Sequence, residues 1–309
     1  MKRYTTNGPR PFLKWVGGKT QLLPALEARL PFDFSRSVRV YAEPFVGGGA
    51  FLFRLLEKGM RPERVIINDS NRDLANAYRT VRDHAADLVA ELDAMQTAYR
   101  AQADEAARKE FFLRIRAEYN RGAADRDTAP VRRTAQLLFL NRTCFNGLYR
   151  VNARGEFNVP FGRYVNPRIC DEETIRADAA ALAGTEILDG DFADALAEAG
   201  RGWFVYLDPP YRPLSRTSSF CDYTQGGFDD GEQRRRASVC RELDVRGARW
   251  LLSNSDPKGK DPGDSFFEDL YAGFDIRGVR ASRMLNADPT KRGKLGELLI
   301  SNYTEGGLL

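Results

Sequence analysis

One stretch near the amino terminus constrains the fold more than any other part of the chain. Residues 38–42 alternate as a strand does, glycines occupy 47–49, and residues 50–58 carry the apolar spacing of a helix. Residues 64–67 are rich in β-branched side chains and are followed closely by Asp69. A strand, a glycine turn, a helix and a second strand with an acid at its tip predict the opening of a Rossmann-like α/β sheet.

Beyond this opening, a long helical segment interrupts the strand pattern. Residues 71–120 and 131–140 have helical composition, and glycine and asparagine punctuate 141–164 as in a loop or hairpin. Strand patterns then resume over residues 185–188, 203–207, 249–252, 274–281 and 296–303. We therefore predict an α/β fold in which 1–70 and 170–309 form the sheet domain and 71–169 form an inserted, mostly helical domain.

Composition and charge exclude several classes of function. No apolar run approaches the roughly 18 residues of a membrane span, and the polar amino terminus lacks a secretory signal, so we expect a cytoplasmic protein. The four cysteines form no CxxC pair and the single histidine is His84, so neither a zinc site nor a histidine base is expected. The net charge is +4, but residues 141–168 hold five arginines against one acid, which suits either a polyanionic partner or a solvated loop.

A motif that can carry chemistry follows the strand pattern at 203–207: Asp208, Pro209, Pro210 and Tyr211. In open α/β sheets, ligands bind at the carboxyl ends of the strands, where this motif would lie. A carboxylate and a prolyl carbonyl can accept both hydrogens of an amino group, and a tyrosine ring offers a face on which a flipped base can stack. Taken alone, the motif would fit equally well a turn that ends the strand at two prolines.

A second motif lies at the turn after the first strand, where residues 42–50 read AEPFVGGGA. Glycines at this point let the backbone approach a nucleotide-like ligand closely. Glu43 at the strand end suits a cationic amino-acid group better than a pyrophosphate, and Asp69 is placed to accept ribose hydroxyls. The alternative is a tight turn from strand to helix without a ligand.

A third motif, PFLKWVGGK at residues 11–19, has an aromatic residue between two lysines and a glycine pair. These residue types suggest a ligand or phosphate contact. The motif is not a P-loop, because the first glycine of that pattern would stand at position 13, which is Leu13. The alternative is an amino-terminal strap whose Phe12 and Trp15 pack into the core.

Together these motifs closely resemble one family. FLKWVGGK, EPFVGGGAFLF, IINDSN, NRTCFNGLYRVNARGEFNVPFGRY and YLDPPY occur in this order. The combination resembles the Dam-type (D12 class, α-group) DNA adenine-N6 methyltransferases from Phe12 to about Tyr303, with a weaker zone at about 80–130. The resemblance implies a Rossmann-like S-adenosylmethionine-dependent methyltransferase sheet, and it identifies 71–169 as a target-recognition domain that carries a β-hairpin.

The resemblance implies that S-adenosylmethionine is the cofactor. Its principal binding positions would be Trp15, Lys19, Asp69 and Asp208. Glu43, Phe45 and Gly47 resemble the family's first cofactor motif. Asp191 and Phe192 resemble the segment that meets the adenine ring of the cofactor, although Asp191 could instead be a helix N-cap.

The resemblance also implies that double-stranded DNA is the partner. Phe145 and Asn146 would fill the gap left by the flipped adenine, and Lys14 would contact the outer part of the site. Leu148, Arg150, Pro160 and Arg163 match positions that read bases in relatives recognising GATC. Arg142 and Arg154 are expected to contact phosphates, and Asn152 belongs to the same DNA-contacting set.

The mechanism that we expect is direct in-line methyl transfer. Adenine would leave the duplex and enter a pocket lined by Asp208, Pro209, Pro210 and Tyr211, so no cysteine nucleophile is required. We expect a monomer, or a weak dimer on DNA. The sequence fits a solitary enzyme, one half of a restriction–modification pair, or an enzyme encoded by a phage.

Several alternatives stay open at this point. Methylation of cytosine N4 uses the same amino-group chemistry, but that group more often carries serine where this chain has Asp208. An adenine methyltransferase with another recognition site also fits, whereas an RNA adenine would leave the FNGLYR stretch without a role. The glycine spacing speaks against a nicotinamide-dependent dehydrogenase. The intact motifs speak against a non-enzymatic DNA-binding regulator or an inactive relative.

Overall fold

The computed structural model of the chain describes most of its residues. The described ranges are 8–15, 17–122, 129–212, 229–282, 294–304 and 307–308. The chain forms two compact units, each assembled from several segments. The first unit comprises residues 1–18, 47–59 and 71–187, and the second comprises 19–46, 60–70 and 188–309. Among the described helices, none is both long and apolar enough to cross a membrane.

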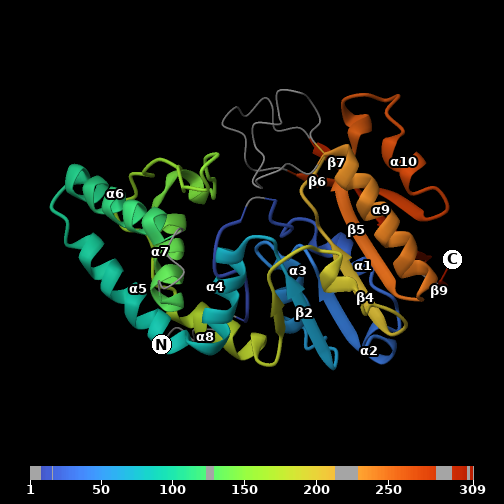
Figure 1. Ribbon diagram of the computed structural model, residues 1–309, viewed down its shortest axis with the longest axis horizontal. Helices are drawn as coiled ribbons and strands as arrows, with labels where there is room; N and C mark the ends of the chain where they lie inside the picture. The colour runs from blue at the N-terminus through green and yellow to red at the C-terminus, as the bar shows by residue number, and fades with distance from the viewer. Residues whose placement is uncertain are drawn as a thin grey trace, which may run out of the picture. The chain divides into compact units, whose positions relative to one another are not determined.

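A seven-stranded sheet with the strand order β3-β2-β1-β4-β5-β7-β6 confirms the predicted Rossmann-like α/β fold (Figure 1). The strands are β1 (Val40–Glu43), β2 (Arg64–Asn68), β3 (Glu186–Leu188), β4 (Trp203–Leu207), β5 (Arg249–Ser255), β6 (Asp275–Ser282) and β7 (Lys294–Ser301). Strands β2, β1, β4 and β5 pair in parallel, whereas β7 runs antiparallel to both β5 and β6. The strand order reverses between β1 and β4, which is where such sheets bind ligands at their carboxyl edge.

The second unit buries the central strands of this sheet completely. Every residue of β1 and β4 is buried, which explains why β4 reads as a continuous apolar run rather than an alternating one. Helix α9 (Asp230–Val245) packs against β5 (Figure 1). Its N-cap is Asp229, whose carboxylate accepts a hydrogen bond from the backbone N–H of Glu232. The described part of this unit also contains the shorter α-helices α1 (Leu23–Ala28), α2 (Phe34–Ser37) and α10 (Phe266–Leu270).

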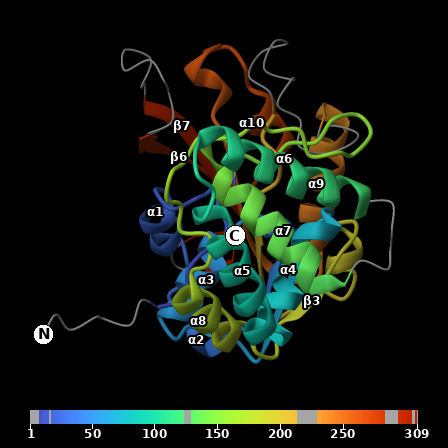
Figure 2. The ribbon, with the colours of Figure 1, turned by 90° about the vertical axis from the view of Figure 1, so that its left-hand side faces the viewer.

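The first unit is mostly helical. Its helices are α3 (Ala50–Glu57), α4 (Arg72–Asp83), α5 (Ala85–Arg100), α6 (Glu105–Gly122), α7 (Pro130–Thr143) and α8 (Glu172–Leu182). Helix α7 packs against α4, α5 and α6 and forms the centre of this unit (Figures 1 and 2). Phe139 of α7 is fully buried between the rings of Tyr99 and Phe111, so an aromatic cluster holds these helices together.

The predicted elements differ from the structure mainly at their ends. The helix predicted over 131–140 is α7, which continues to Thr143 and so brings Asn141 into its last turn. The strand predicted over 296–303 ends at Ser301. Residues Tyr303–Thr304 form β8, which instead pairs with β9 (Gly307–Leu308) in a separate two-stranded sheet.

The region 141–164 forms a hairpin with little regular pairing. A 3-10 turn, η1 (Phe145–Gly147), follows α7, and two isolated antiparallel bridges join Cys144 to Phe161 and Val151 to Phe157. The first compact unit contains all of 71–169 and adds the amino-terminal segment, residues 47–59 and α8 to it. The role of 71–169 as a target-recognition domain stays a prediction.

Candidate active site

Three of the acids predicted to belong to the site lie at or just beyond the carboxyl ends of three neighbouring strands of the second unit. Glu43 is the last residue of β1, Asp69 follows β2, and Asp208 follows β4. Asn68, which is 2% exposed, donates to the carbonyl oxygens of Pro44 (3.0 Å) and Gly190 (3.1 Å). This amide therefore fixes two loops that carry further predicted residues, one after β1 and one after β3.

Asp208 is held by two partners, and both use the same carboxylate oxygen. The Lys19 ammonium lies 2.9 Å from Oδ1, and the Ser253 hydroxyl donates to Oδ1 over 2.9 Å. Ser253 also shares a hydrogen bond of 3.1 Å with the hydroxyl of Tyr206. Burial raises the pKa of Asp208, while Lys19 and Ser253 oppose that shift. The site thus holds a carboxylate that binds a proton more readily than an exposed aspartate.

Tyr211 presents its ring beside this carboxylate. The Lys19 ammonium lies 4.3 Å from the ring centroid, and the tyrosine hydroxyl donates to Oε2 of Glu297 over 2.6 Å. Burial raises the pKa of Tyr211 well above its usual value, so the phenol stays protonated and keeps donating. Glu297 is a residue of β7 and is only 9% exposed. A largely buried side chain therefore holds the hydroxyl end of Tyr211.

The two prolines have different surroundings. Gln233 of α9, which is fully buried, donates from Nε2 to the carbonyl of Pro210 over 3.4 Å. The carbonyl oxygen of Gln233 in turn accepts a hydrogen bond of 2.6 Å from Arg236. A buried amide and a buried guanidinium therefore support the loop from behind. The Pro210 carbonyl is thus already engaged within the protein.

Phe45 and Phe192 pack together, with ring centroids 5.0 Å apart. Arg235 of α9 lies over the Phe192 ring at 4.6 Å and holds Asp191 through two hydrogen bonds of 2.9 and 2.5 Å. Arg235 lowers the pKa of Asp191, which is therefore ionised at neutral pH. Asp191 is not the N-cap of the following 3-10 helix, η2 (Asp194–Leu196), whose N-cap is Ala193. Its Oδ1 nevertheless accepts from the backbone N–H of Ala193 over 2.8 Å, so Asp191 also stabilises the turn that leads into η2.

Trp15 and Gly47 belong to the first unit and contact each other. A Cβ atom at Gly47, whose φ is +49°, would lie 3.0 Å from Cδ1 of Trp15, so only glycine lets the ring approach this closely. Trp15 also stacks against Tyr149, with ring centroids 5.0 Å apart and planes inclined by 27°. Phe12 instead packs into the core at 3% exposure, so the core-packing alternative holds for Phe12.

The turn after α7 exposes the residues expected at the flipped base. Phe145 is 52% exposed although it is a large apolar side chain, and Asn146 has a left-handed backbone with φ of +56°. Leu148 is half-buried, and Pro160 is exposed with its carbonyl accepting from the N–H of Phe145 over 2.9 Å. An exposed ring on a constrained turn is suited to insertion into a partner.

The far end of the hairpin is organised by Asn152. Its Oδ1 accepts from the backbone N–H groups of Arg154 (2.9 Å) and Glu156 (3.0 Å), so Asn152 shapes the loop from within. Arg150 is exposed, and its Nε donates to Oδ1 of Asn158 across the hairpin over 2.7 Å. Its Nη2 also donates to the backbone carbonyl of Asn158 over 3.4 Å, so the guanidinium is held across the hairpin by one residue.

Three further DNA-contact candidates have unequal exposure. Lys14 and Arg163 are exposed, whereas Arg142 is half-buried and donates to the carbonyl of Phe12 over 2.8 Å. Burial lowers the pKa of Arg142. Arg142 therefore ties α7 to the amino-terminal strap, whatever further contact it makes.

Reasoning from sequence missed several residues of this site. They are Asn68, Gln233, Arg235, Ser253 and Glu297. A usable signal existed for Ser253, because LLSNS changes from apolar to polar at the carboxyl end of a buried strand, where ligands bind. Asn68 ends the strand directly before Asp69, so its place was visible in the sequence although its hydrogen-bond partners were not. Gln233, Arg235 and Glu297 come from elements whose pairing is not visible in the sequence.

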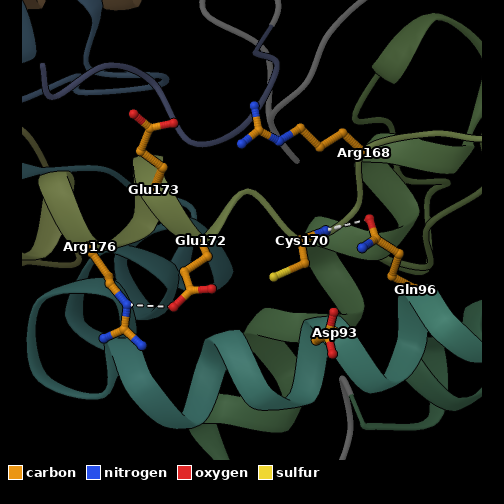
Figure 3. Close-up of a pocket in the computed structure, with 7 residues that line it drawn as sticks. All are labelled: Asp93, Gln96, Arg168, Cys170, Glu172, Glu173 and Arg176. Carbon is orange, nitrogen blue, oxygen red and sulfur yellow. Dashed lines mark hydrogen bonds and ion pairs between the residues drawn. The ribbon is translucent and has the colours of Figure 1, made fainter. Parts of the chain in front are cut away.

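A polar hollow of about 450 Å³ lies elsewhere on the first unit, between α5 and the start of α8 (Figure 3). Its lining residues are Asp93, Gln96, Arg168, Cys170, Glu172, Glu173 and Arg176. Arg176 pairs with Glu172 over 2.8 Å, and burial raises the pKa of the Cys170 thiol, which makes it a poor nucleophile. None of the predicted site residues lines this hollow. Within the described ranges, no cluster of His, Cys, Asp and Glu could hold a metal ion.

Comparison with known proteins gives one consistent result. A family model described as D12 class N6 adenine-specific DNA methyltransferase matches residues 15–285. The type II methyltransferase M.MjaIII of Methanocaldococcus jannaschii is 46% identical over 296 residues, which are 95% of this chain and 99% of the relative. The DNA adenine methylases of Serratia marcescens and Escherichia coli K12 are 34% and 32% identical to this chain. Each match spans 94% of this chain, and the matches span 97% and 94% of the two relatives, respectively.

Proposed function

Because the chain belongs to the D12 class of N6 adenine-specific DNA methyltransferases, we propose that it transfers the methyl group of S-adenosylmethionine to an adenine flipped out of duplex DNA. The reaction at adenine N6 and the DNA substrate follow from the family, which also removes cytosine N4 as an alternative. The observation that carries the finer proposal is the arrangement of Asp208, with one carboxylate oxygen engaged by Lys19 and Ser253 and an aromatic ring beside it.

The residues at the strand ends fit S-adenosylmethionine. Glu43 is a carboxylate at 2% exposure that suits the cationic amino-acid end, and Asp69 suits the ribose hydroxyls. The rings of Phe45 and Phe192 offer an apolar wall for an adenine ring. Trp15 and Gly47 would complete the set, because the glycine turn has room for no side chain. When bound, the cofactor supplies a methyl group on a positively charged sulfur.

Asp208 would bind and orient the amino group of the target adenine. Lys19 and Ser253 both contact Oδ1, so we assign Oδ2 to one N6 hydrogen and the Pro209 carbonyl to the other. Two acceptors draw the nitrogen lone pair out of conjugation with the ring and make it a better nucleophile. Tyr211 would stack on the base, because Glu297 holds its hydroxyl and thereby fixes the ring plane.

The reaction releases one proton, and Asp208 is suited to take it. As the new N–C bond forms, the amino nitrogen carries a proton in excess, and Oδ2 would already accept one of its hydrogens. Burial raises the pKa of Asp208, which makes this carboxylate a better proton acceptor than an exposed one. No covalent bond to the protein is needed.

For the recognition site, we propose GATC. Arg150 is exposed, and arginine is the natural bidentate reader of guanine; it would exchange its contacts with Asn158 for the base. Leu148, Pro160 and Arg163 occupy the matching positions of the same hairpin. Phe145 would fill the gap left by the flipped adenine, for which its exposed ring is suited.

The test is transfer of a labelled methyl group from S-adenosylmethionine to plasmid DNA, followed by digestion with nucleases that respond to N6-methyladenine. Label confined to GATC supports the whole proposal, and label at another sequence refutes the assignment of Arg150 and its neighbours. We expect Asp208→Ala to abolish transfer while DNA binding persists. Glu198→Ala, at an exposed acid after η2, is the control and should transfer normally. Near-normal turnover of Asp208→Ala would refute the catalytic assignment.

A further inference from the structure

Asn141, in the last turn of α7, uses its side-chain amide to bracket another segment of the chain. Its Oδ1 accepts from the backbone N–H of Lys14 over 2.8 Å, and its Nδ2 donates to the carbonyl of Lys14 over 2.8 Å. The same Nδ2 donates to the carbonyl of Gly147 over 2.9 Å. The side chain is 3% exposed, so these bonds have little competition from water. Only an amide can donate and accept in this way.

The two segments joined by this amide differ in the proposed function, because only the strap would contact the cofactor. Lys14 would contact the outer part of the DNA site, and it precedes Trp15, which would contact the cofactor. Gly147 lies between Asn146 and Leu148, which would contact the DNA. Gly147 has a φ of +66°, and a Cβ there would lie 2.4 Å from Cδ of Lys14, so the turn and the strap are in close contact.

A second contact joins the same two segments. The Trp15 ring approaches Gly47 closely and also stacks against the Tyr149 ring. Tyr149 is 7% exposed and stands between Leu148 and Arg150 in the hairpin. A shift of the strap at Trp15 would therefore reach the DNA-reading residues by two routes, through the amide of Asn141 and through the ring of Tyr149.

We propose that Asn141 is a positioning residue that couples cofactor binding at the strap to DNA recognition at the hairpin. The inference rests on the proposed function of the two segments. A cofactor that orders the strap also orders the turn. Binding of DNA then requires less further ordering of the protein and costs less conformational entropy. Coupling of this kind is reciprocal, so DNA must tighten cofactor binding by the same factor.

The chain contains a matched control for this arrangement. Asn120 of α6 brackets Phe157 in the same way: it accepts from the backbone N–H over 2.8 Å and donates to the carbonyl over 3.1 Å. Its partner lies in the outer part of the hairpin and not on the strap. Asn120→Asp therefore removes the same type of bracket from the same hairpin without touching the link to Lys14.

The experiment measures the dissociation constant of a GATC duplex with and without saturating S-adenosylhomocysteine, as a stable stand-in for the cofactor. We expect the ratio of the two constants to be about 10 in the wild-type protein and in Asn120→Asp, within the usual range of coupling. In Asn141→Asp, the new carboxylate faces two carbonyl oxygens, and the ratio should fall to about 1. Thermal unfolding of each variant shows whether it is folded.

Tyr149→Leu removes the second link and should lower the ratio even if Asn141→Asp fails to fold. An unchanged ratio in a folded Asn141→Asp, or in Tyr149→Leu where the first variant does not fold, overturns the inference. A wild-type ratio of about 1, with both ligands bound, overturns it too. If the wild-type protein binds no S-adenosylhomocysteine or no duplex, the proposed function itself fails, and this outcome is distinct from the others.

Discussion

Replacing Ser253 with alanine should slow methyl transfer and move its pH dependence. Ser253 is fully buried and donates to Oδ1 of Asp208 over 2.9 Å, so Ser253→Ala removes one of the two partners of that oxygen. A hydrogen bond to a charged group contributes about 1.5–3 kcal/mol. If the bond is made fully in the transition state, its loss slows transfer by about 10- to 160-fold.

The direction of the pH shift follows from the charge on Asp208. Ser253 lowers the pKa of this carboxylate, so its removal raises that pKa further. In the proposed mechanism, transfer needs the ionised carboxylate, so activity should be lost as the pH falls through this pKa. The acidic limb of the rate profile should therefore move to higher pH in Ser253→Ala.

Single-turnover transfer to saturating duplex, measured from about pH 5.5 to 9, tests both expectations. Ser238→Ala on α9 is the matched control, because this hydroxyl is exposed and donates to the carbonyl of Arg234 in the same helix. DNA affinity should be unchanged in both variants. A folded Ser253→Ala protein with a normal rate and an unmoved acidic limb would refute the argument that this hydroxyl holds the reacting carboxylate.

Three further predictions concern stability and can be checked by urea or thermal unfolding. Tyr211→Phe leaves the buried carboxylate of Glu297 without its 2.6 Å donor, and should lower the unfolding free energy by about 1–3 kcal/mol; an unchanged value counts against this bond. Burial raises the pKa of Asp178 from its ordinary value of 3.8 to about 8 in the folded chain. At a pH between these two values, the folded chain therefore keeps a proton that the unfolded chain releases. Wild-type stability should then fall as pH rises between these values, and Asp178→Asn should lack that fall. Gly49→Ala places a Cβ 2.5 Å from a tyrosine hydroxyl at φ of +67° and should be more destabilising than Gly59→Ala, which has a similar φ and open space.

The parts of the site that could be predicted are those encoded by neighbouring residues. Strand β4 was predicted with its bounds, because WFVYL is a fully apolar run that ends at Asp208 and two prolines. The turn at Gly47 could be placed because it lies between a strand pattern and a helix pattern. In both cases the motif and the element that positions it are contiguous in the chain.

The partners of these residues could not be predicted, because they arrive from distant parts of the chain. Ser253 meets Asp208 because β5 lies beside β4, and Glu297 meets Tyr211 because β7 is inserted antiparallel next to β5. The strand order, not the local pattern, creates these contacts. Asn141 was missed for a related reason: the apolar spacing of α7 ends at Leu140, whereas the helix continues because tertiary hydrogen bonds satisfy its last polar turn.

The charges around Tyr206 lead to one last expectation about the methyl donor. Asp208, Glu43 and Glu297 all contribute to a raised pKa of Tyr206 beyond the effect of its burial, so three carboxylates share this region. Glu43 and Glu297 each accept a hydrogen bond from a tyrosine hydroxyl, at 2.7 and 2.6 Å. A phenol is neutral, so these hydrogen bonds do not cancel the charge of a carboxylate.

The Lys19 ammonium offsets the charge of Asp208, so Glu43 and Glu297 are the acids that would favour a cationic sulfonium over the neutral thioether that remains after transfer. Glu297→Gln removes one charge and keeps an oxygen acceptor for Tyr211. We therefore expect this variant to weaken binding of S-adenosylmethionine more than binding of S-adenosylhomocysteine, as calorimetry of both ligands can show. Equal weakening of the two would mean that Glu297 acts by holding the tyrosine and not by its charge.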